Sequence, residues 1–224
     1  DLDLWKNHAM ESLSAPLLEE TSTMDVYSND GLQEVSLPGL QEAADLVFHS
    51  NASLESLDLS SMAEASSVDV NSNASLEEIA LDALLDVDTL DIYSNTGLQE
   101  VNLSGLAEAN TFNVYSNPDL STMSMTNLSC VDSYNLNGND FSQEARFDIL
   151  RQLTCQEEGS LLVFLPQDTV EFCATGATSV VDLSISSSGS GNVDMSCLTE
   201  VAGDLTISDT ESNLVDLSGL QTVG

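Results

Sequence analysis

The sequence predicts a mainly β fold, a parallel two-sheet solenoid of the β-helix or leucine-rich-repeat kind with 22-residue coils. Two observations carry this prediction. An asparagine returns every 22 residues, at Asn7, Asn29, Asn51, Asn73, Asn95, Asn117 and Asn139. Within each repeat, two pairs of apolar residues alternate with polar ones, as in strands with one buried face. A fixed period of this length is typical of a solenoid, in which each coil buries its apolar residues against the next.

Each repeat is numbered here from its asparagine as position zero. Positions 6 and 8 form the first predicted strand, and positions 17 and 19 form the second, as in Phe112 and Val114. Stacked coils then give two parallel sheets, and we expect a right-handed coil because parallel crossovers have that hand. The asparagine follows the second strand, where the chain must turn. Because a buried amide needs partners, we expect the asparagines to bond to backbone groups and to one another along the stack.

We expect one elongated domain that is interrupted once. Residues 1–139 form the regular array, and residues 179–224 resume it, since Leu198 and Leu220 are again 22 residues apart. Residues 140–178 break the pattern and are predicted to be an insertion. Its first part, 141–154, carries an apolar stripe at helical spacing, and its two short apolar runs, 161–165 and 169–173, are predicted to form a hairpin.

The resumed array contains the phrase Glu200-Val-Ala-Gly-Asp-Leu-Thr-Ile207. This phrase resembles the repeats of receptor L-domains and of related microbial cell-surface proteins. The first array is similar to the same group and to leucine-rich repeats. It departs from them in lacking the glycine before its strand and in placing its leucine three residues after the asparagine rather than two. The resemblance implies a solenoid fold and implies no particular function.

The charge of the chain is extreme. It has 38 acidic residues against three basic ones, a net charge of −35. Such a chain is repelled by nucleic acid and by anionic membranes, so we expect neither as a partner. No apolar run approaches the ~18 residues that a membrane span needs, so membrane insertion is not expected. The charge suits a protein that works in salty water or beside divalent cations.

Four cysteines indicate a secretory route and an extracellular or cell-surface location. They are Cys130, Cys155, Cys173 and Cys197. They allow three pairings. Cys130–Cys197 is disfavoured, because coils two steps apart separate these residues by about 9–10 Å. Cys130–Cys155 with Cys173–Cys197 would join both ends of the insertion to the array; the remaining pairing stays open.

Four Asn-x-Ser sequons point to the same route. Two of them begin at Asn51 and Asn73, which belong to the asparagine column and are expected to be buried. The better glycosylation candidates are therefore Asn102 and Asn127. The chain has no initiating methionine and no signal peptide, so it reads as a mature or excised segment.

Outward positions of the second strand offer a candidate ligand-binding face. Positions 18 and 20 place an Asp/Asn column beside an aromatic column, whose candidate residues are Trp5, Tyr27, Asp69, Asp91, Tyr93, Asn113 and Tyr115. Aromatic rings stack on sugars, and carboxylates and amides bond to sugar hydroxyls. The alternative is cross-strand ring stacking that only stabilises the sheet.

Position 13 gives a second column, made almost entirely of carboxylates. Its members are Glu20, Glu42, Glu64, Asp86 and Glu108. Neighbouring carboxylates about 5 Å apart repel each other, and calcium bridging would remove that repulsion. Calcium is therefore a possible cofactor here, against the alternative of a solvated acidic face, and no other cofactor is expected.

The only histidines, His8 and His49, have no catalytic constellation around them in the sequence, so an enzyme is not expected. We expect an extracellular structural repeat protein, a building block of a cell-surface filament or matrix. Gly224 and Asp1 are consecutive in the repeat register, which predicts end-to-end stacking in a head-to-tail homopolymer or tandem array. The alternative is a receptor-like or adhesive module that binds a glycan or a surface protein through the Tyr/Asp strand face.

Overall fold

A computed structural model of the chain confirms a mainly β, parallel solenoid with turns of about 22 residues. The structure describes residues 1–128, 131–142, 145–146, 149, 152–153, 161–163, 166–174, 176–185, 191–208, 210 and 212–224. The chain forms two compact units, unit 1 (Asp1–Cys155) and unit 2 (Gln156–Gly224), which are described separately.

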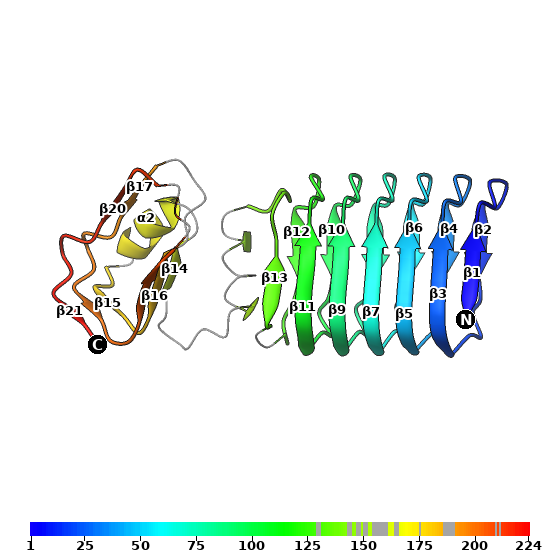
Figure 1. Cartoon of the computed structure of the whole chain (residues 1–224), viewed down its shortest axis with the longest axis horizontal. Coiled ribbons are helices and arrows are strands. Elements are labelled where there is room, and N and C mark those ends of the chain that lie inside the picture. Colours follow the sequence, from blue (N-terminus) through cyan, green and yellow to red (C-terminus); the bar gives the residue numbers. More distant parts are fainter. Residues whose placement is uncertain are drawn as a thin grey trace. The chain divides into compact units, whose positions relative to one another are not determined.

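Unit 1 is built from two parallel sheets, whose strands lie side by side along the array in Figure 1. The seven-stranded sheet contains β1 (Leu2–Trp5), β3 (Glu20–Tyr27), β5 (Glu42–His49), β7 (Glu64–Asn71), β9 (Asp86–Tyr93), β11 (Glu108–Tyr115) and β13 (Ser133–Asn135). The six-stranded sheet contains β2 (Ser12–Ser14), β4 (Glu34–Ser36), β6 (Ser56–Asp58), β8 (Glu78–Ala80), β10 (Glu100–Asn102) and β12 (Thr122–Ser124).

Every strand of unit 1 pairs in parallel with the strand one coil away, in a register of 22 residues, as Leu90 pairs with Phe112. The apolar columns predicted to face inward are buried; Leu46, Val68, Leu90 and Phe112 are all 0% exposed. The second strand is longer than predicted, because pairing runs through positions 13 to 20 instead of covering only 17 and 19. Two successive residues face outward near its middle, Asp88 and Thr89 in β9, and the ladder omits the pair at the first of them, Asp88 with Asn110.

The last coil of unit 1 is followed by a helical segment. Of the predicted helix 141–154, Ala145, Arg146, Ile149, Gln152 and Leu153 are helical, and residues 141 and 142 are not. The rest of it lies outside the described residues. Ile149 is 4% exposed and Leu153 0%, and the Leu153 carbonyl accepts a hydrogen bond from the Val131 N–H at 3.0 Å. The segment thus packs on the end of the array and covers apolar surface there.

Unit 2 has three small parallel sheets. Its elements are β14 (Leu161–Val163), α2 (Pro166–Ala174), β15 (Ser179–Val180), β16 (Leu183–Ile185), β17 (Asn192–Asp194), β18 (Glu200–Val201), β19 (Leu205–Ile207), β20 (Leu214–Asp216) and β21 (Thr222–Val223). The sheets are β14-β16-β19, β15-β18-β21 and β17-β20. Each pairing within the first and third sheets again joins residues 22 apart.

The predicted hairpin is wrong. Residues 161–163 do form a strand, but it pairs in parallel with β16. The second run lies in α2, which begins at Pro166, a residue favoured at the first helical position because its missing N–H costs nothing there. β14, α2 and β15 therefore belong to the first coil of unit 2, with a helix in place of one strand, and the two units divide the predicted insertion between them.

Cys173, near the end of α2, forms a disulfide with Cys197 in the next coil, with Cα atoms 5.8 Å apart. This bond confirms half of the pairing considered from the sequence. Cys130 and Cys155 lie outside the described residues.

Candidate functional site

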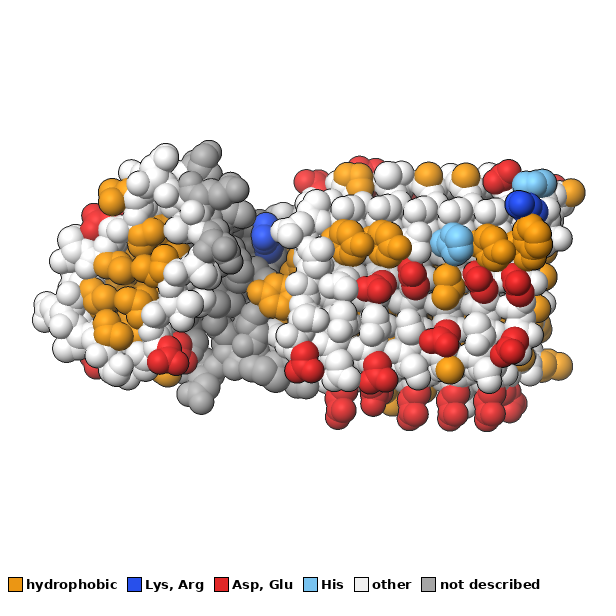
Figure 2. Space-filling view, viewed as in Figure 1, with side chains coloured by type: hydrophobic (Ala, Val, Ile, Leu, Met, Phe, Trp, Pro, Cys, Tyr) orange, Lys and Arg blue, Asp and Glu red, His pale blue; other side chains and the backbone are white. Residues whose placement is uncertain are grey.

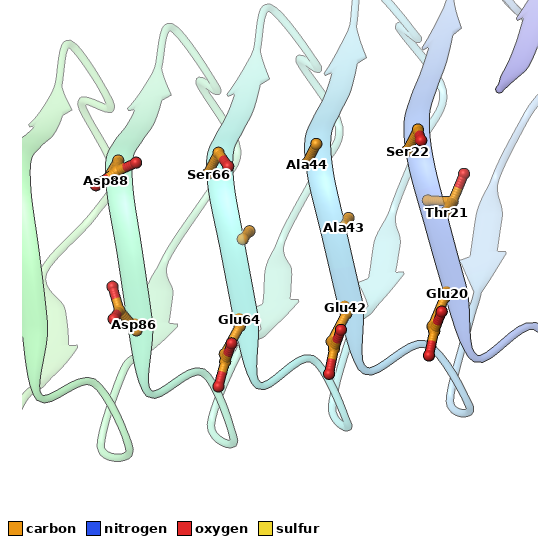
Figure 3. A pocket seen from close by; sticks show the side chains of 11 residues that line it. Glu20, Thr21, Ser22, Glu42, Ala43, Ala44, Glu64, Ser66, Asp86 and Asp88 are labelled. Atoms are coloured by element: carbon orange, nitrogen blue, oxygen red, sulfur yellow. The ribbon is translucent and has the colours of Figure 1, made fainter.

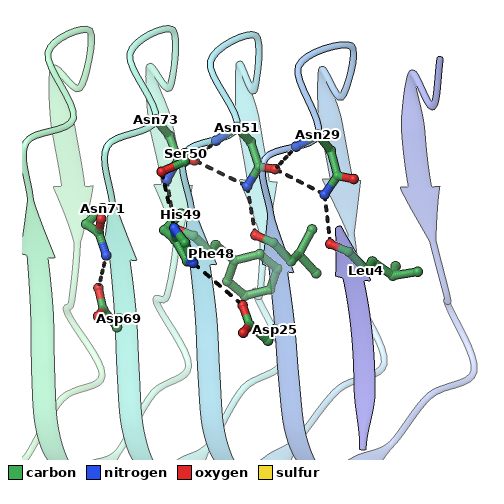
Figure 4. Close-up of polar contacts among 11 residues, drawn as sticks. Leu4, Asp25, Asn29, Phe48, His49, Ser50, Asn51, Asp69, Asn71 and Asn73 are labelled. Atoms are coloured by element: carbon green, nitrogen blue, oxygen red, sulfur yellow. Dashed lines mark hydrogen bonds and ion pairs between the residues drawn. The ribbon is translucent and has the colours of Figure 1, made fainter. Parts of the chain in front are cut away.

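The asparagine column forms a continuous ladder inside unit 1, as Figure 4 shows for three of its members. The Asn51 backbone N–H donates to Asn73 Oδ1 at 3.0 Å, and Asn51 Nδ2 donates to the Val26 carbonyl at 2.8 Å. The backbone bond repeats from Asn7 to Asn117, whose acceptor is Asn139 Oδ1. The five inner asparagines are 0% exposed. The predicted ladder is therefore present, and it occupies the sequons that begin at Asn51 and Asn73.

The residue before each ladder asparagine adopts a left-handed backbone conformation, which the sequence reading missed. The φ angles lie between 55° and 57° for Lys6, Ser28, Ser50, Ser72, Ser94 and Ser116, and Gly138 has 76°. A non-glycine residue in this region is strained. The one sequence signal was Gly138, which stands where the other repeats have serine or lysine. This turn aims each asparagine amide into the stack.

The aromatic column lies on the outer face of the seven-stranded sheet, in the row visible in Figure 2. Its rings stack face to face in two groups, Trp5–Tyr27–His49 and Tyr93–Tyr115, with Asn71 between them. The ring centroids of Tyr27 and His49 are 4.9 Å apart, as are those of Tyr93 and Tyr115, and Trp5 lies 6.0 Å from Tyr27. Tyr27 has a ring on each face, whereas Tyr93 and Tyr115 each have one face stacked on the other ring. This is the cross-strand ring stacking that was the alternative to a ligand-binding face. Ligand binding at this face stays a prediction.

The neighbouring Asp/Asn column makes its own polar contacts. Asn113 Nδ2 donates to Asp91 Oδ1 at 2.8 Å, and Asp69 accepts from Asn71 Nδ2 at 2.7 Å. Asp25 Oδ1 faces His49 Nε2 at 3.9 Å (Figure 4). Burial raises the pKa of both Asp25 and Asp69 above the ordinary carboxyl value, although the His49 ring opposes this rise in each. The column therefore holds carboxylates that are partly withdrawn from water.

Four of the five position-13 carboxylates, all except Glu108, line a shallow groove of about 670 Å³. Glu20, Glu42, Glu64 and Asp86 pair in register on adjacent strands and project on one side of the groove, while Asp88 lies on the other (Figure 3). Small residues line the rest of it, with Ala43 between the two rows and Ser66 in the row of Asp88. No three His, Cys, Asp or Glu side chains among the described residues are grouped so that they could hold a metal ion. The structure supplies one carboxylate per coil at position 13, with Asp88 as a second one in the coil of Asp86, and calcium binding here stays a prediction.

The two favoured glycosylation candidates lie on the surface of unit 1. Asn102, on β10, is half-buried, and its Oδ1 accepts a hydrogen bond from the Ser104 N–H at 3.1 Å. Asn127 is exposed and donates to the Ser104 carbonyl at 2.8 Å. Modification of either residue remains a prediction.

Taken with the sheets and the ladder, these features define the class of protein, a parallel β-solenoid of about nine turns with a repeat of about 22 residues. No family model, curated protein or solved structure matches the chain. Within the described part of the chain, none of the helices has the length and apolar character needed to cross a membrane.

Proposed function

We propose that the chain is an extracellular structural repeat protein, a building block of a cell-surface filament or matrix, with no catalytic role. The carrying observation is the uninterrupted register of unit 1, in which both sheets and the ladder repeat every 22 residues. Each buried asparagine joins several coils: Asn73 donates to the Phe48 carbonyl and to Asn95, and accepts from Asn51. Such cross-bracing makes a stiff rod with outward side chains spaced about 4.8 Å apart.

Assembly by coil stacking fits the polarity of this rod. All strands are parallel, and each ladder asparagine from Asn7 to Asn117 donates toward the next one along the chain, so solenoid ends join only head to tail. We propose that further copies, or tandem units of the same kind, stack on the side of β1 that faces away from β3. A head-to-tail contact that does not close produces a filament.

Electron microscopy and fibre diffraction of native material, with sizing of the isolated chain over a range of concentrations, test this assembly. Filaments with an axial repeat of about 4.8 Å and concentration-dependent growth are expected. A chain that stays monomeric at high concentration, and native material without filaments, would contradict the proposal.

The cell-surface setting has two supports in unit 2. The Cys173–Cys197 disulfide is of a kind that persists in oxidising compartments. The phrase that resembles receptor L-domains has a structural reason for its glycine: a Cβ at Gly203 would collide with the Asp182 carboxylate, which accepts a hydrogen bond from the Asp204 N–H at 2.8 Å. We therefore propose an L-domain-like or leucine-rich-repeat-like relationship for unit 2.

The alternative proposal is an adhesive module that binds a glycan or a protein through the aromatic and Asp/Asn columns. The partly exposed carboxylates and amides beside the ring edges favour it, since they can bond to sugar hydroxyls. A glycan array separates the two proposals. Binding that is lost in Tyr93→Ala and Tyr115→Ala supports the adhesive module; the absence of any binding supports the structural role.

A further inference from the structure

Two tyrosines of the aromatic column are arranged for a reaction with each other. Tyr93 on β9 and Tyr115 on β11 pair in register, their ring centroids are 4.9 Å apart, and their planes differ by 4°. Both side chains are partly exposed. Tyr27 stacks on Trp5 and His49 instead. Among the described residues this is the one stacked pair of tyrosines.

We propose that Tyr93 and Tyr115 are an oxidative cross-linking site, at which hydrogen peroxide and a peroxidase-type catalyst form a dityrosine bond between adjacent coils. The inference concerns the reactivity of this pair, and it holds whether the rod assembles into filaments or binds a ligand.

The reaction is balanced as follows. Each phenol loses one electron and its hydroxyl proton to the oxidant, which leaves two tyrosyl radicals. A carbon–carbon bond forms between one Cε of each ring, next to the oxygen-bearing carbon, and the rings become dienones. The hydrogen on each bonded carbon then moves to its own oxygen and restores two phenols. The two hydrogen atoms removed overall reduce one hydrogen peroxide to two water molecules.

The stacked geometry favours this coupling over other outcomes. The unpaired electron of a tyrosyl radical occupies orbitals perpendicular to the ring, so bond formation proceeds between ring faces. In Tyr93 and Tyr115 those faces already oppose each other at nearly the strand spacing, and an intramolecular reaction between held groups gains a large effective concentration. Tyr27 has no phenol opposite either face, because the neighbouring rings belong to Trp5 and His49.

Burial and nearby carboxylates keep the phenol of Tyr93 in its protonated form. Burial raises the pKa of Tyr93, and the charges of Asp69 and Asp91 raise it further. The phenol is thus protonated at neutral pH, and its oxidation removes the hydroxyl proton together with the electron. The net charge of −35 also opposes encounters between separate chains, which favours coupling within one chain.

The test uses the full chain at high dilution with horseradish peroxidase and hydrogen peroxide. Dityrosine fluorescence reports the product, and peptide mapping by mass spectrometry locates it. We expect monomeric chain that has lost two hydrogen atoms, in a cross-linked peptide pair containing residues 93 and 115. Tyr93→Phe keeps the stacked ring but removes the phenol, so dityrosine should be abolished.

Tyr27→Phe is the matched control, since it removes a phenol from the same column and should leave the yield unchanged. Circular dichroism establishes that both variants are folded before oxidation. Dityrosine that persists in Tyr93→Phe, that maps to Tyr27 or occurs only in covalent dimers, or that fails to form in the folded wild-type chain would overturn the proposal.

Discussion

Removing one inner asparagine should destabilise unit 1 far more than its single side chain suggests. Asn73→Ala deletes the Nδ2 donor to the Phe48 carbonyl at 2.8 Å and the Oδ1 acceptor of the Asn51 N–H at 3.0 Å. Both backbone groups lie where water cannot replace the lost partner, because Asn51 and Phe48 are 0% exposed. A buried polar group left without its partner costs about 1–3 kcal/mol, so the two groups together lower the free energy of unfolding by about 2–6 kcal/mol.

Asn71→Ala is the matched control. Asn71 lies two residues away on the outer face, is half-buried, and donates only to the Asp69 carboxylate in the described contacts. Its removal should cost about 1 kcal/mol, the usual net worth of one hydrogen bond. The assay is denaturant unfolding of the full chain, followed by the fluorescence of Trp5, the one tryptophan, which lies in unit 1. Equal losses in the two variants would refute the view that the ladder holds the coils together.

Other predictions follow from the turn, the charges and the disulfide. Ser72→Gly should stabilise unit 1 by about 0.5–1 kcal/mol in the same assay, because glycine relieves a left-handed φ; Ser66→Gly, at an ordinary φ, should destabilise it. Burial raises the pKa of Asp69 above its ordinary 3.8, so the folded chain binds that proton more tightly. The free energy of unfolding should therefore rise as the pH falls from neutral toward the ordinary carboxyl pKa of 3.8, and Asp69→Asn should make this dependence on pH less steep. The melting temperature should rise when sodium chloride or calcium is added, since repulsion within the acidic columns then weakens, and it should fall with a chelator, since the repulsion then strengthens. A melting temperature that is unchanged by all of these would contradict the prediction. Cys197→Ser should cost unit 2 about 3 kcal/mol, measured by circular dichroism during denaturant unfolding, because the bond closes a loop of 24 residues.

The 22-residue period and the asparagine ladder were predictable because every coil of a solenoid makes the same contacts with its neighbours. One misread residue changes little when six other repeats give the same pattern, so the inward columns around Leu90 and the burial of Asn51 followed directly from spacing. The same redundancy fixed the strand register, since a shift by one residue would turn an entire apolar column outward.

Features that occur once were harder to predict. The run 169–173 is short and apolar, and periodicity over so few residues does not separate a strand from a helix. In the structure this run lies in α2, which begins at Pro166. The left-handed serines carry no strong signal, because serine is uncommon in that conformation.

The orientation of the rings on the candidate ligand-binding face could not be predicted from residue spacing. The sequence placed Tyr93 and Tyr115 in one column, but whether their faces point to solvent or to each other depends on side-chain orientation. In the structure the two rings stack with their centroids 4.9 Å apart. The faces that oppose each other are therefore placed for a reaction between the two tyrosines and not for stacking on a sugar.

Hydrogen exchange of asparagine side-chain amides, followed by NMR in the full chain, tests the central claim most directly. If the buried ladder holds unit 1 together, the Nδ2 protons of Asn29, Asn51, Asn73, Asn95 and Asn117 should exchange only when unit 1 unfolds, far more slowly than those of half-buried Asn71. Exchange of the five inner amides at the rate of Asn71 would contradict the account.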